Sequence, residues 1–182
     1  MDHADHVALL RDGVRPAGPG NALWADLGSG TGAFTLALAD LLGPGGRIVS
    51  VDRDASALRQ QAAAMAGRFS SVALEQRVAD FTKDLDLSPL DGIVMANALH
   101  FQRDRQAAVE HVRGMLRPGG RLVLVEYDAD RGNPWVPYPL SFETWRRMAV
   151  DAGFDEPRLL GRVPSRFLGA IYSALALRPE AD

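Results

Sequence analysis

The sequence contains no cysteine and only one lysine, Lys83, among its 182 residues. A chain without cysteine has neither a disulfide framework nor a thiolate metal site. The four histidines do not combine with acidic residues at the spacing of a metal centre. We therefore predict a protein that binds no metal, and the sequence gives no sign of an oxidising compartment.

Long apolar runs and blocks of basic residues are also missing. No segment approaches the about 20 apolar residues that span a membrane. The N-terminal letters MDHADH place acids and histidines where a signal peptide has a basic start and an apolar run. The formal net charge is −3 and the arginines are dispersed, so no block can neutralise a run of phosphates. These absences predict a cytoplasmic protein that binds neither membranes nor nucleic acid.

Short apolar runs alternate with helical stretches, a pattern typical of an α/β fold with a parallel sheet. The hydrophobic content of 47% suits one domain with a substantial core. We expect a single domain over residues 1–182, with a short N-terminal helix or extension over 1–20 and the core over 21–178. The expected strands are 21–27, 46–52, 72–80, 91–99, 120–128, 156–163 and 167–178. The expected helices are 31–43, 54–69, 103–120 and 141–154.

The last third of the chain differs from the rest. A proline-rich loop, NPWVPYPL at 133–140, precedes the helix expected at 141–154. The two final strands are separated only by PSR at 164–166, which is too short for a parallel crossover. We therefore predict an antiparallel hairpin at the end of the sheet.

A glycine-rich turn, DLGSGTG at 26–32, lies between the first expected strand and the first long helix. Glycines let a backbone approach a ligand closely, and the amides at a helix start attract an anionic group. The glycines alone leave two cofactors open. A dinucleotide site would use Gly28, Gly30 and Ala33, with Asp52 bonded to a ribose.

Other polar residues follow the expected strands. Asp26 ends the first strand, where an acid suits a ligand that carries an ammonium group. Asp80 ends the third strand, and Asn97 and His100 follow the fourth. Open α/β sheets bind ligands at the carboxyl ends of their strands. These residues therefore predict one polar crevice.

With these motifs in order along the chain, the sequence resembles the class I S-adenosylmethionine-dependent methyltransferases, in particular small-molecule members of the methyltransferase 11 and 25 type. The signature is Asp26-Leu27-Gly28-Ser29-Gly30-Thr31-Gly32, and the likeness extends over about residues 21–178. The resemblance implies a Rossmann-like seven-stranded mixed sheet, order 3-2-1-4-5-7-6, with strand 7 antiparallel and helices on both faces.

The resemblance also implies how the cofactor S-adenosylmethionine is held. Asp26 would hold the methionine amino group with help from the Asn97 carbonyl, and Asp52 would take the ribose hydroxyls. Arg53 would flank the adenine, Asp80 would accept from its amine, and the Phe81 amide would face a ring nitrogen. The backbone of the turn, at Gly28, Ser29, Gly30 and Gly32, would carry the methionyl and ribose parts.

Two interpretations of His100 stay open. Its ordinary pKa suits proton transfer near neutrality, so His100 is a candidate general base close to the expected methyl position. It can equally be a packed residue that orients the loop after the fourth strand. Glu126 and Tyr127, at the end of the fifth strand, can face the acceptor or bond neighbouring loops.

The acceptor pocket needs a cover, and the proline-rich loop is one candidate. Trp135 and Tyr138 offer aromatic walls there, although both side chains can instead pack on the sheet. A second subunit is the other candidate, and we expect a monomer or a homodimer.

The leading interpretation is an enzyme that transfers a methyl group to a small-molecule acceptor by direct in-line displacement. The acceptor atom can be oxygen, nitrogen or carbon. A noncatalytic S-adenosylmethionine-binding or partner-dependent subunit is the alternative. An NAD-dependent oxidoreductase is strongly disfavoured, because a Tyr/Lys proton donor would have to use Lys83, the only lysine.

Overall fold

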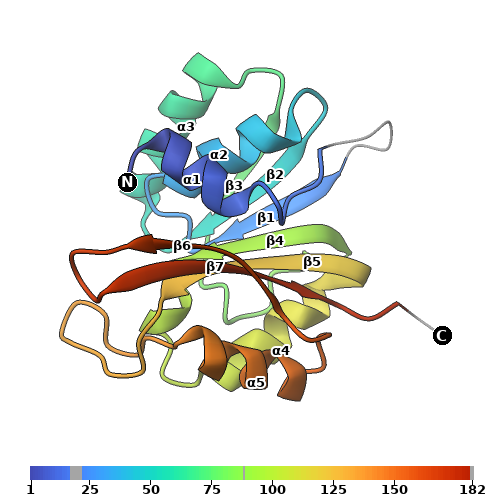
Figure 1. Cartoon of the computed structure of the whole chain (residues 1–182). Helices are drawn as coiled ribbons and strands as arrows, with labels where there is room; N and C mark the ends of the chain where they lie inside the picture. The colour runs from blue at the N-terminus through green and yellow to red at the C-terminus, as the bar shows by residue number, and fades with distance from the viewer. Residues whose placement is uncertain (17–21, 88, 181–182) are drawn as a thin grey trace.

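In the computed structural model, which describes residues 1–16, 22–87 and 89–180, seven strands form one sheet in the order β3-β2-β1-β4-β5-β7-β6 (Figure 1). Strand β7 runs antiparallel to both of its neighbours, whereas the other pairs are parallel. The strands are β1 (Leu23–Leu27), β2 (Arg47–Asp52), β3 (Ala73–Val78), β4 (Leu90–Ala96), β5 (Leu116–Tyr127), β6 (Arg158–Pro164) and β7 (Ala170–Leu177). The predicted strand order and the reversed seventh strand are both confirmed.

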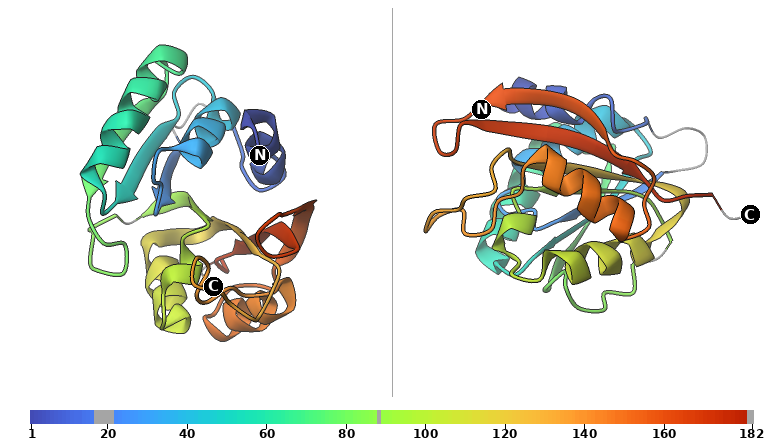
Figure 2. Two further views of the ribbon diagram at one scale, coloured as in Figure 1. Left: turned by 90° about the vertical axis from the view of Figure 1, so that its left-hand side faces the viewer. Right: turned by 60° about the horizontal axis from the view of Figure 1, so that its bottom comes forward.

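Helices cover both faces of the sheet, as predicted (Figure 2). The helices are α1 (His3–Leu10), α2 (Ala33–Leu42), α3 (Ala55–Arg68), α4 (Arg105–Met115) and α5 (Phe142–Asp151), with a short 3₁₀ helix, η1 (Leu99–Phe101). Helices α1, α2 and α3 lie on one face, and α4 and α5 lie on the other. Because side chains alternate along a strand, Val123 and Val125 of β5 join the α1–α2 core, whereas Leu122 and Leu124 join the α4–α5 core.

Helix α1 lies within the N-terminal stretch for which we expected a helix or an extension. Asp2 caps it through a reciprocal capping box with Asp5. Its buried side chains, Val7, Leu9 and Leu10, pack in the same core as α2. The expected boundary between residues 20 and 21 lies outside the described residues.

Two predicted boundaries differ from the structure by more than three residues. The helix expected to run to the glycines at 119–120 ends at Met115, and β5 begins at Leu116 instead of Gly120. Leu116 is buried and pairs with Leu90 of β4, and the Gly119 amide donates to the Arg178 carbonyl at 2.9 Å. Pairing with distant strands therefore decides this boundary rather than the local stop signal of Pro118.

The final hairpin has a longer turn than the predicted PSR. Strand β7 starts at Ala170, and the turn spans 165–169, closed by the Ser165 amide on the Gly169 carbonyl at 2.8 Å. Gly169 takes a φ of +67°, which a residue with a side chain rarely adopts. A glycine three residues after PSR therefore sets the length of the turn.

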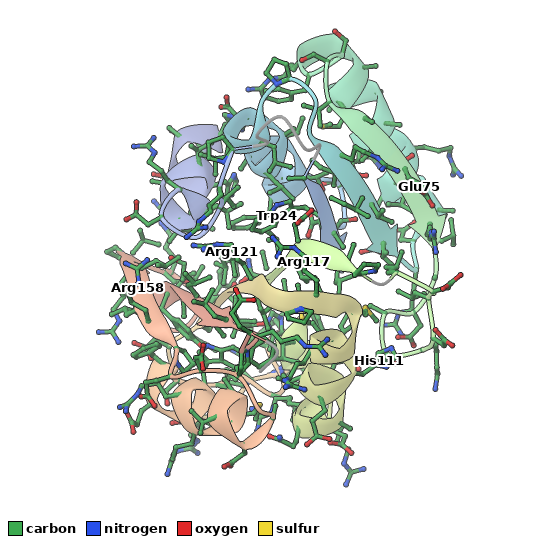
Figure 3. All side chains as sticks on the ribbon, turned by 90° about the vertical axis from the view of Figure 1, so that its right-hand side faces the viewer. Trp24, Glu75, His111, Arg117, Arg121 and Arg158 are labelled. Atoms are coloured by element: carbon green, nitrogen blue, oxygen red, sulfur yellow. The ribbon has the colours of Figure 1, made fainter. Side chains whose placement is uncertain are left out.

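The edge at which the parallel strands begin is braced by arginines (Figure 3). Arg121 of β5 donates from Nε to the Gly13 carbonyl at 2.6 Å, which fastens the segment after α1 to the sheet. Arg117 pairs with Asp91 at 2.7 Å across the β4–β5 junction. The opposite edge, where the parallel strands end, is left for a ligand site. Within the described ranges, no helix is both long and apolar enough to cross a membrane.

Gly92 of β4 is a position at which a single methyl group should harm the fold. A Cβ there would lie 2.5 Å from three carbons of the buried Trp24 indole. We expect Gly92→Ala to lower the free energy of unfolding by about 1–3 kcal/mol, because the indole must shift in a close-packed core. The measurement is the urea midpoint. Gly114→Ala on α4 is the matched control, since its Cβ meets no atom within 4 Å; equal midpoints for the two variants would contradict the prediction.

Candidate cofactor and acceptor site

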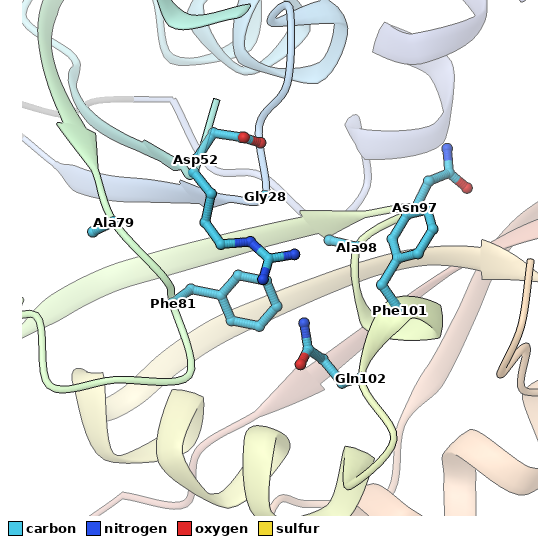
Figure 4. A pocket seen from close by; sticks show the side chains of 9 residues that line it. Gly28, Asp52, Ala79, Phe81, Asn97, Ala98, Phe101 and Gln102 are labelled. Atoms are coloured by element: carbon cyan, nitrogen blue, oxygen red, sulfur yellow. The ribbon is translucent and has the colours of Figure 1, made fainter. Parts of the chain in front are cut away.

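A cavity of about 210 Å³ opens at the carboxyl ends of the strands, beside the junction of β1 and β4 (Figure 4). This is the crevice in which open α/β sheets bind ligands. Five of its lining residues are ones that the sequence pointed to: Gly28, Asp52, Arg53, Phe81 and Asn97. Four lining residues were not predicted: Ala79, Ala98, Phe101 and Gln102.

The glycine turn after β1 forms one wall of the cavity. Gly28, Gly30 and Gly32 have φ values of +76°, +52° and +91°, which side-chain-bearing residues rarely adopt. A Cβ on Gly28 would lie 2.5 Å from that of Ala98, so glycine lets the β4 loop come close to the turn. Gly32 caps α2, whose first amides have no partners inside the helix. The turn is therefore shaped for backbone contact with a ligand.

Asp52, the last residue of β2, holds the same turn from the other side. Its Oδ2 accepts from the Gly30 amide at 2.8 Å, and its Oδ1 accepts from the Asp54 amide at 2.8 Å. The carboxylate lines the cavity, within reach of a ligand hydroxyl. Neighbouring Arg53 is largely exposed, with its guanidinium 3.9 Å from the Asp80 carboxylate.

Asp26 lies beneath the turn rather than in the wall of the cavity. Its side chain is buried, and its Oδ2 accepts from the Thr35 hydroxyl of α2 at 2.5 Å. Desolvation raises the pKa of Asp26 to about 7, and the negative charge of Asp52 acts in the same direction. The Thr35 hydrogen bond lowers the pKa only in part.

Asp80 and Phe81 follow β3, and Asp80 is not among the residues that line the cavity. The Asp80 carboxylate accepts from the Thr82 amide at 2.9 Å and from the Thr82 hydroxyl at 2.8 Å. These bonds hold the pKa of Asp80 below its ordinary value. Phe81 both lines the cavity and belongs to the α4–α5 core, so the structure gives it a packing role beside its predicted backbone contact.

His100 and Glu126 form a buried pair next to the cavity. His100 lies in η1 after β4, and Glu126 lies near the end of β5. The His100 Nδ1 is 2.8 Å from Glu126 Oε2, and the His100 amide donates to Oε1 at 3.1 Å. A carboxylate on Nδ1 fixes the proton there and leaves Nε2 as the basic nitrogen. The sequence singled out both residues but did not pair them.

Aromatic rings enclose this imidazole. The Phe101 ring lies 4.2 Å from it between centroids, and the Tyr127 ring meets it edge-on at 5.6 Å. Phe101 also lines the cavity. The histidine is thus held near the cavity by two rings and a carboxylate.

Asn97 has two unusual features. Its φ is +52°, one of two positive values among non-glycine residues of the described chain. Its amide donates to the Val125 carbonyl of β5 at 2.8 Å, which ties this residue to the sheet just after the end of β4. The side-chain Oδ1 is buried and has no hydrogen-bond partner among the described residues. Strained backbone and an unpartnered polar atom mark a place where a ligand group fits.

The loop after β5 is anchored beside His100. The Tyr138 amide donates to the His100 carbonyl at 3.0 Å, and Arg105 of α4 donates to the Pro139 carbonyl at 2.7 Å. At its start Asp128 pairs with Arg162 of β6 at 2.7 Å. Trp135 is 74% exposed, so it does not pack on the sheet. Among residues 1–16, 22–87 and 89–180, no group of three metal-ligating side chains gathers.

Residues 25–122 match the family described as "Methyltransferase domain", and the chain belongs to this family. The chain is thus a methyltransferase domain of the S-adenosylmethionine-dependent kind. The reducing polyketide synthase grgA of Penicillium sp. is 26% identical over 159 residues, which are 72% of this chain and 6% of the synthase. The hybrid PKS-NRPS synthetase apdA of Emericella nidulans is 28% identical over 156 residues, 71% of this chain and 4% of the synthetase. The chain thus spans only a small part of these relatives.

Solved methyltransferases share the fold. The CurJ carbon methyltransferase superposes with a TM-score of 0.71 at 21% identity, covering 90% of this chain and 50% of that one. The 1,6-didemethyltoxoflavin-N1-methyltransferase of Burkholderia thailandensis, with its acceptor and S-adenosylhomocysteine bound, gives 0.76 at 19% identity, covering 98% and 78%. These likenesses establish the sheet and its helices as a methyltransferase fold.

Proposed function

We propose that the protein methylates a small molecule at an acidic carbon next to carbonyl groups, with His100 as the general base. The observation that carries the proposal is the buried His100–Glu126 pair beside the cavity. A base is needed only where the acceptor must lose a proton before it attacks. An amine with a free lone pair needs none, whereas a carbon acid does. The printed names of the relatives, polyketide synthases and a carbon methyltransferase, favour carbon.

The cavity fits the cofactor on several independent observations. Gly28, with its positive φ, places the backbone of the turn in the wall of the cavity. Asp52 presents a carboxylate for two ribose hydroxyls, and the apolar Phe81 and Ala79 suit an adenine. We propose that Asp80 and Arg53 flank the adenine edge. The methionyl part would lie over the turn, at Gly28, Ser29, Gly30 and Gly32, with its amino group between Asp26 and the Asn97 carbonyl.

When bound, S-adenosylmethionine supplies an electrophilic methyl group on a sulfonium. His100 Nε2 would accept the acceptor's proton, and Glu126 would stabilise the imidazolium that results. The deprotonated carbon would then take the methyl group, with S-adenosylhomocysteine as the leaving product. The protein would also hold the acceptor carbon in line with the methyl group, which lowers the barrier to transfer.

The test is a transfer assay with a ¹³C-methyl cofactor and three acceptor types: a β-keto thioester, a phenol and an amine. We expect label on the carbon between the two carbonyls of the thioester, located by NMR. Label on oxygen or nitrogen alone would contradict carbon methylation. Binding of the cofactor with no transfer to any acceptor would favour the alternative of a noncatalytic or partner-dependent subunit.

We propose further that the 133–140 loop forms one wall of the acceptor pocket. Its Tyr138 amide bonds the His100 carbonyl, and Trp135 is exposed close by in the chain. Trp135→Ala should raise the KM for the acceptor by about tenfold, which corresponds to the loss of one aromatic contact of 1–1.5 kcal/mol. Cofactor affinity should stay nearly unchanged, as titration calorimetry will show. Leu159→Ala, at the start of β6, is the control; lost cofactor affinity in Trp135→Ala would count against the placement.

A further inference from the structure

Four polar side chains from four elements form a continuous hydrogen-bonded chain under the glycine turn. Gln76 of β3 donates from Nε2 to Gln61 Oε1 of α3 at 2.7 Å. Gln61 donates from Nε2 to Thr35 Oγ1 of α2 at 2.8 Å, and Thr35 donates to Asp26 Oδ2 of β1 at 2.5 Å. Gln61, Thr35 and Asp26 are all buried. Hydrogen bonds at this depth are costly to leave unmade, so the chain is held in one arrangement.

The direction of every donor in the chain is fixed. Gln76 Nε2 also lies 2.7 Å from the Leu58 carbonyl, which can only accept, so the amide nitrogen must face it. Gln61 must therefore turn its oxygen to Gln76 and its nitrogen to Thr35. The single hydroxyl proton of Thr35 is then left for Asp26. All three bonds donate toward Asp26, which lies at the receiving end.

Asp26 has no cation to balance its charge. No ion pair with Asp26 occurs within the described ranges. The titratable group that faces it is Asp52 of β2, which has the same sign. On the helix side Asp26 is bonded to the neutral Thr35, which is bonded in turn to Gln61. Its neighbours in the sheet are the uncharged Ser50 of β2 and Val94 of β4. Burial without a nearby cation disfavours the charged carboxylate and raises the pKa of Asp26 to about 7, so a large share of the free protein holds this proton at neutral pH.

We propose that Thr35 and Gln61 are positioning residues for Asp26, and that binding of the cofactor's ammonium group releases the proton of Asp26 to solvent. The inference rests on the proposed function, because it takes the amino group to lie beside Asp26. Thr35 occupies Oδ2, so Oδ1 is the oxygen that receives the ammonium. The one-way donor chain then stabilises the carboxylate that forms. Cofactor affinity consequently depends on pH through a group that does not touch the reacting carbon.

The experiment is calorimetric titration with S-adenosylhomocysteine between pH 5.5 and 8.5. For the natural protein, affinity should fall up to tenfold for each pH unit below about 7, and binding at pH 6 should release close to one proton, as two buffers of different ionisation enthalpy reveal. 5′-Methylthioadenosine has no amino-acid part, so its affinity should stay flat with pH. This second ligand separates Asp26 from groups near the adenine and ribose.

Thr35→Val tests the positioning role. It removes the donor that lowers the pKa of Asp26, so the midpoint of the pH dependence should move upward. The affinity of the variant should therefore fall below that of the natural protein by its largest and nearly constant factor under pH 7, and the gap should close toward pH 8.5. Gln61→Met should move the midpoint of the pH dependence in the same direction by a smaller amount. It replaces Thr35→Val as the test if that variant does not fold. Gln60→Met, an exposed neighbour on α3, is the matched control and should change nothing.

Three results would overturn the inference. A flat affinity of S-adenosylhomocysteine across the pH range, or no proton release, shows that Asp26 does not titrate on binding, while the binding itself still supports the proposed function. An equal loss of affinity at every pH in Thr35→Val shows a structural role alone. Absence of binding at any pH removes both the inference and the proposed placement of the cofactor.

Discussion

Replacing His100 by alanine should lower the rate of methyl transfer by about 10²–10⁴-fold, the usual contribution of a general base. The imidazole is the basic group held beside the cavity, with Nδ1 committed to Glu126 at 2.8 Å. Cofactor affinity should remain nearly unchanged, because His100 does not line the cavity in which the cofactor is proposed to lie. Single-turnover rates with saturating acceptor measure the first effect, and calorimetry measures the second.

Glu126→Gln is the companion variant. It keeps the side-chain shape and removes the charge that stabilises the imidazolium, so it should slow transfer by a smaller factor and shift the pH–rate profile. His111→Ala is the control for loss of a histidine, since His111 bonds the Lys83 carbonyl far along α4. If His100→Ala folds and transfers methyl groups at the natural rate, His100 is not the general base. It is then a packed residue that orients the loop after β4.

Asp26→Asn should make the free protein more stable at pH 8 and at the same time reduce cofactor affinity by more than tenfold. In the unfolded chain an aspartate ionises near 3.8, whereas burial raises the pKa of Asp26 to about 7 in the folded protein. Between these values the unfolded state loses its proton first, so the natural protein loses stability as pH rises through this window. A gap of about three units at 1.36 kcal/mol each corresponds to roughly 4 kcal/mol above pH 7.

The measurement is urea unfolding of both proteins at pH 5, 6, 7 and 8 without ligand. The stability difference should grow from pH 5 to pH 7 and then level off. The Asn side chain keeps an oxygen that can accept the hydrogen bond from the Thr35 hydroxyl, which is 2.5 Å long in the natural protein. Asp151→Asn, an exposed acid at the end of α5, controls for the loss of one surface charge. A difference that does not vary with pH would contradict a raised pKa.

Much of the fold was predictable because the relevant information is local. Alternating apolar runs and helical stretches gave the elements, and the family resemblance gave the strand order that the structure confirms. The start of β5 was not predictable in the same way. Pro118 and the following glycines are local stop signals for a helix, whereas the pairing of Leu116 with Leu90 joins residues 26 apart.

In the candidate site, too, the residues in local motifs could be predicted and the long-range contacts could not. The positions that line the cavity, such as Gly28, Asp52 and Asn97, follow directly from motifs at strand ends. The partner of His100 does not, although an acid inside the apolar run LVLVEY at 122–127 is a signal that Glu126 is buried. The chain through Thr35 and Gln61 gave no signal, because its members lie on four elements and each residue type is ordinary on a helix or strand.

The anchoring of the loop after β5 has a consequence for enzyme engineering. Asp128 bonds Arg162 and the Phe142 amide, and Asp130 accepts from the amide and hydroxyl of Ser141. The segment 131–137 is therefore held on both sides by residues that are bonded to the rest of the fold. It can be exchanged as a cassette of new sequence and length while the glycine turn and its donor chain stay intact. Libraries restricted to this segment would vary the proposed acceptor wall and leave the residues proposed to hold the methyl donor unchanged.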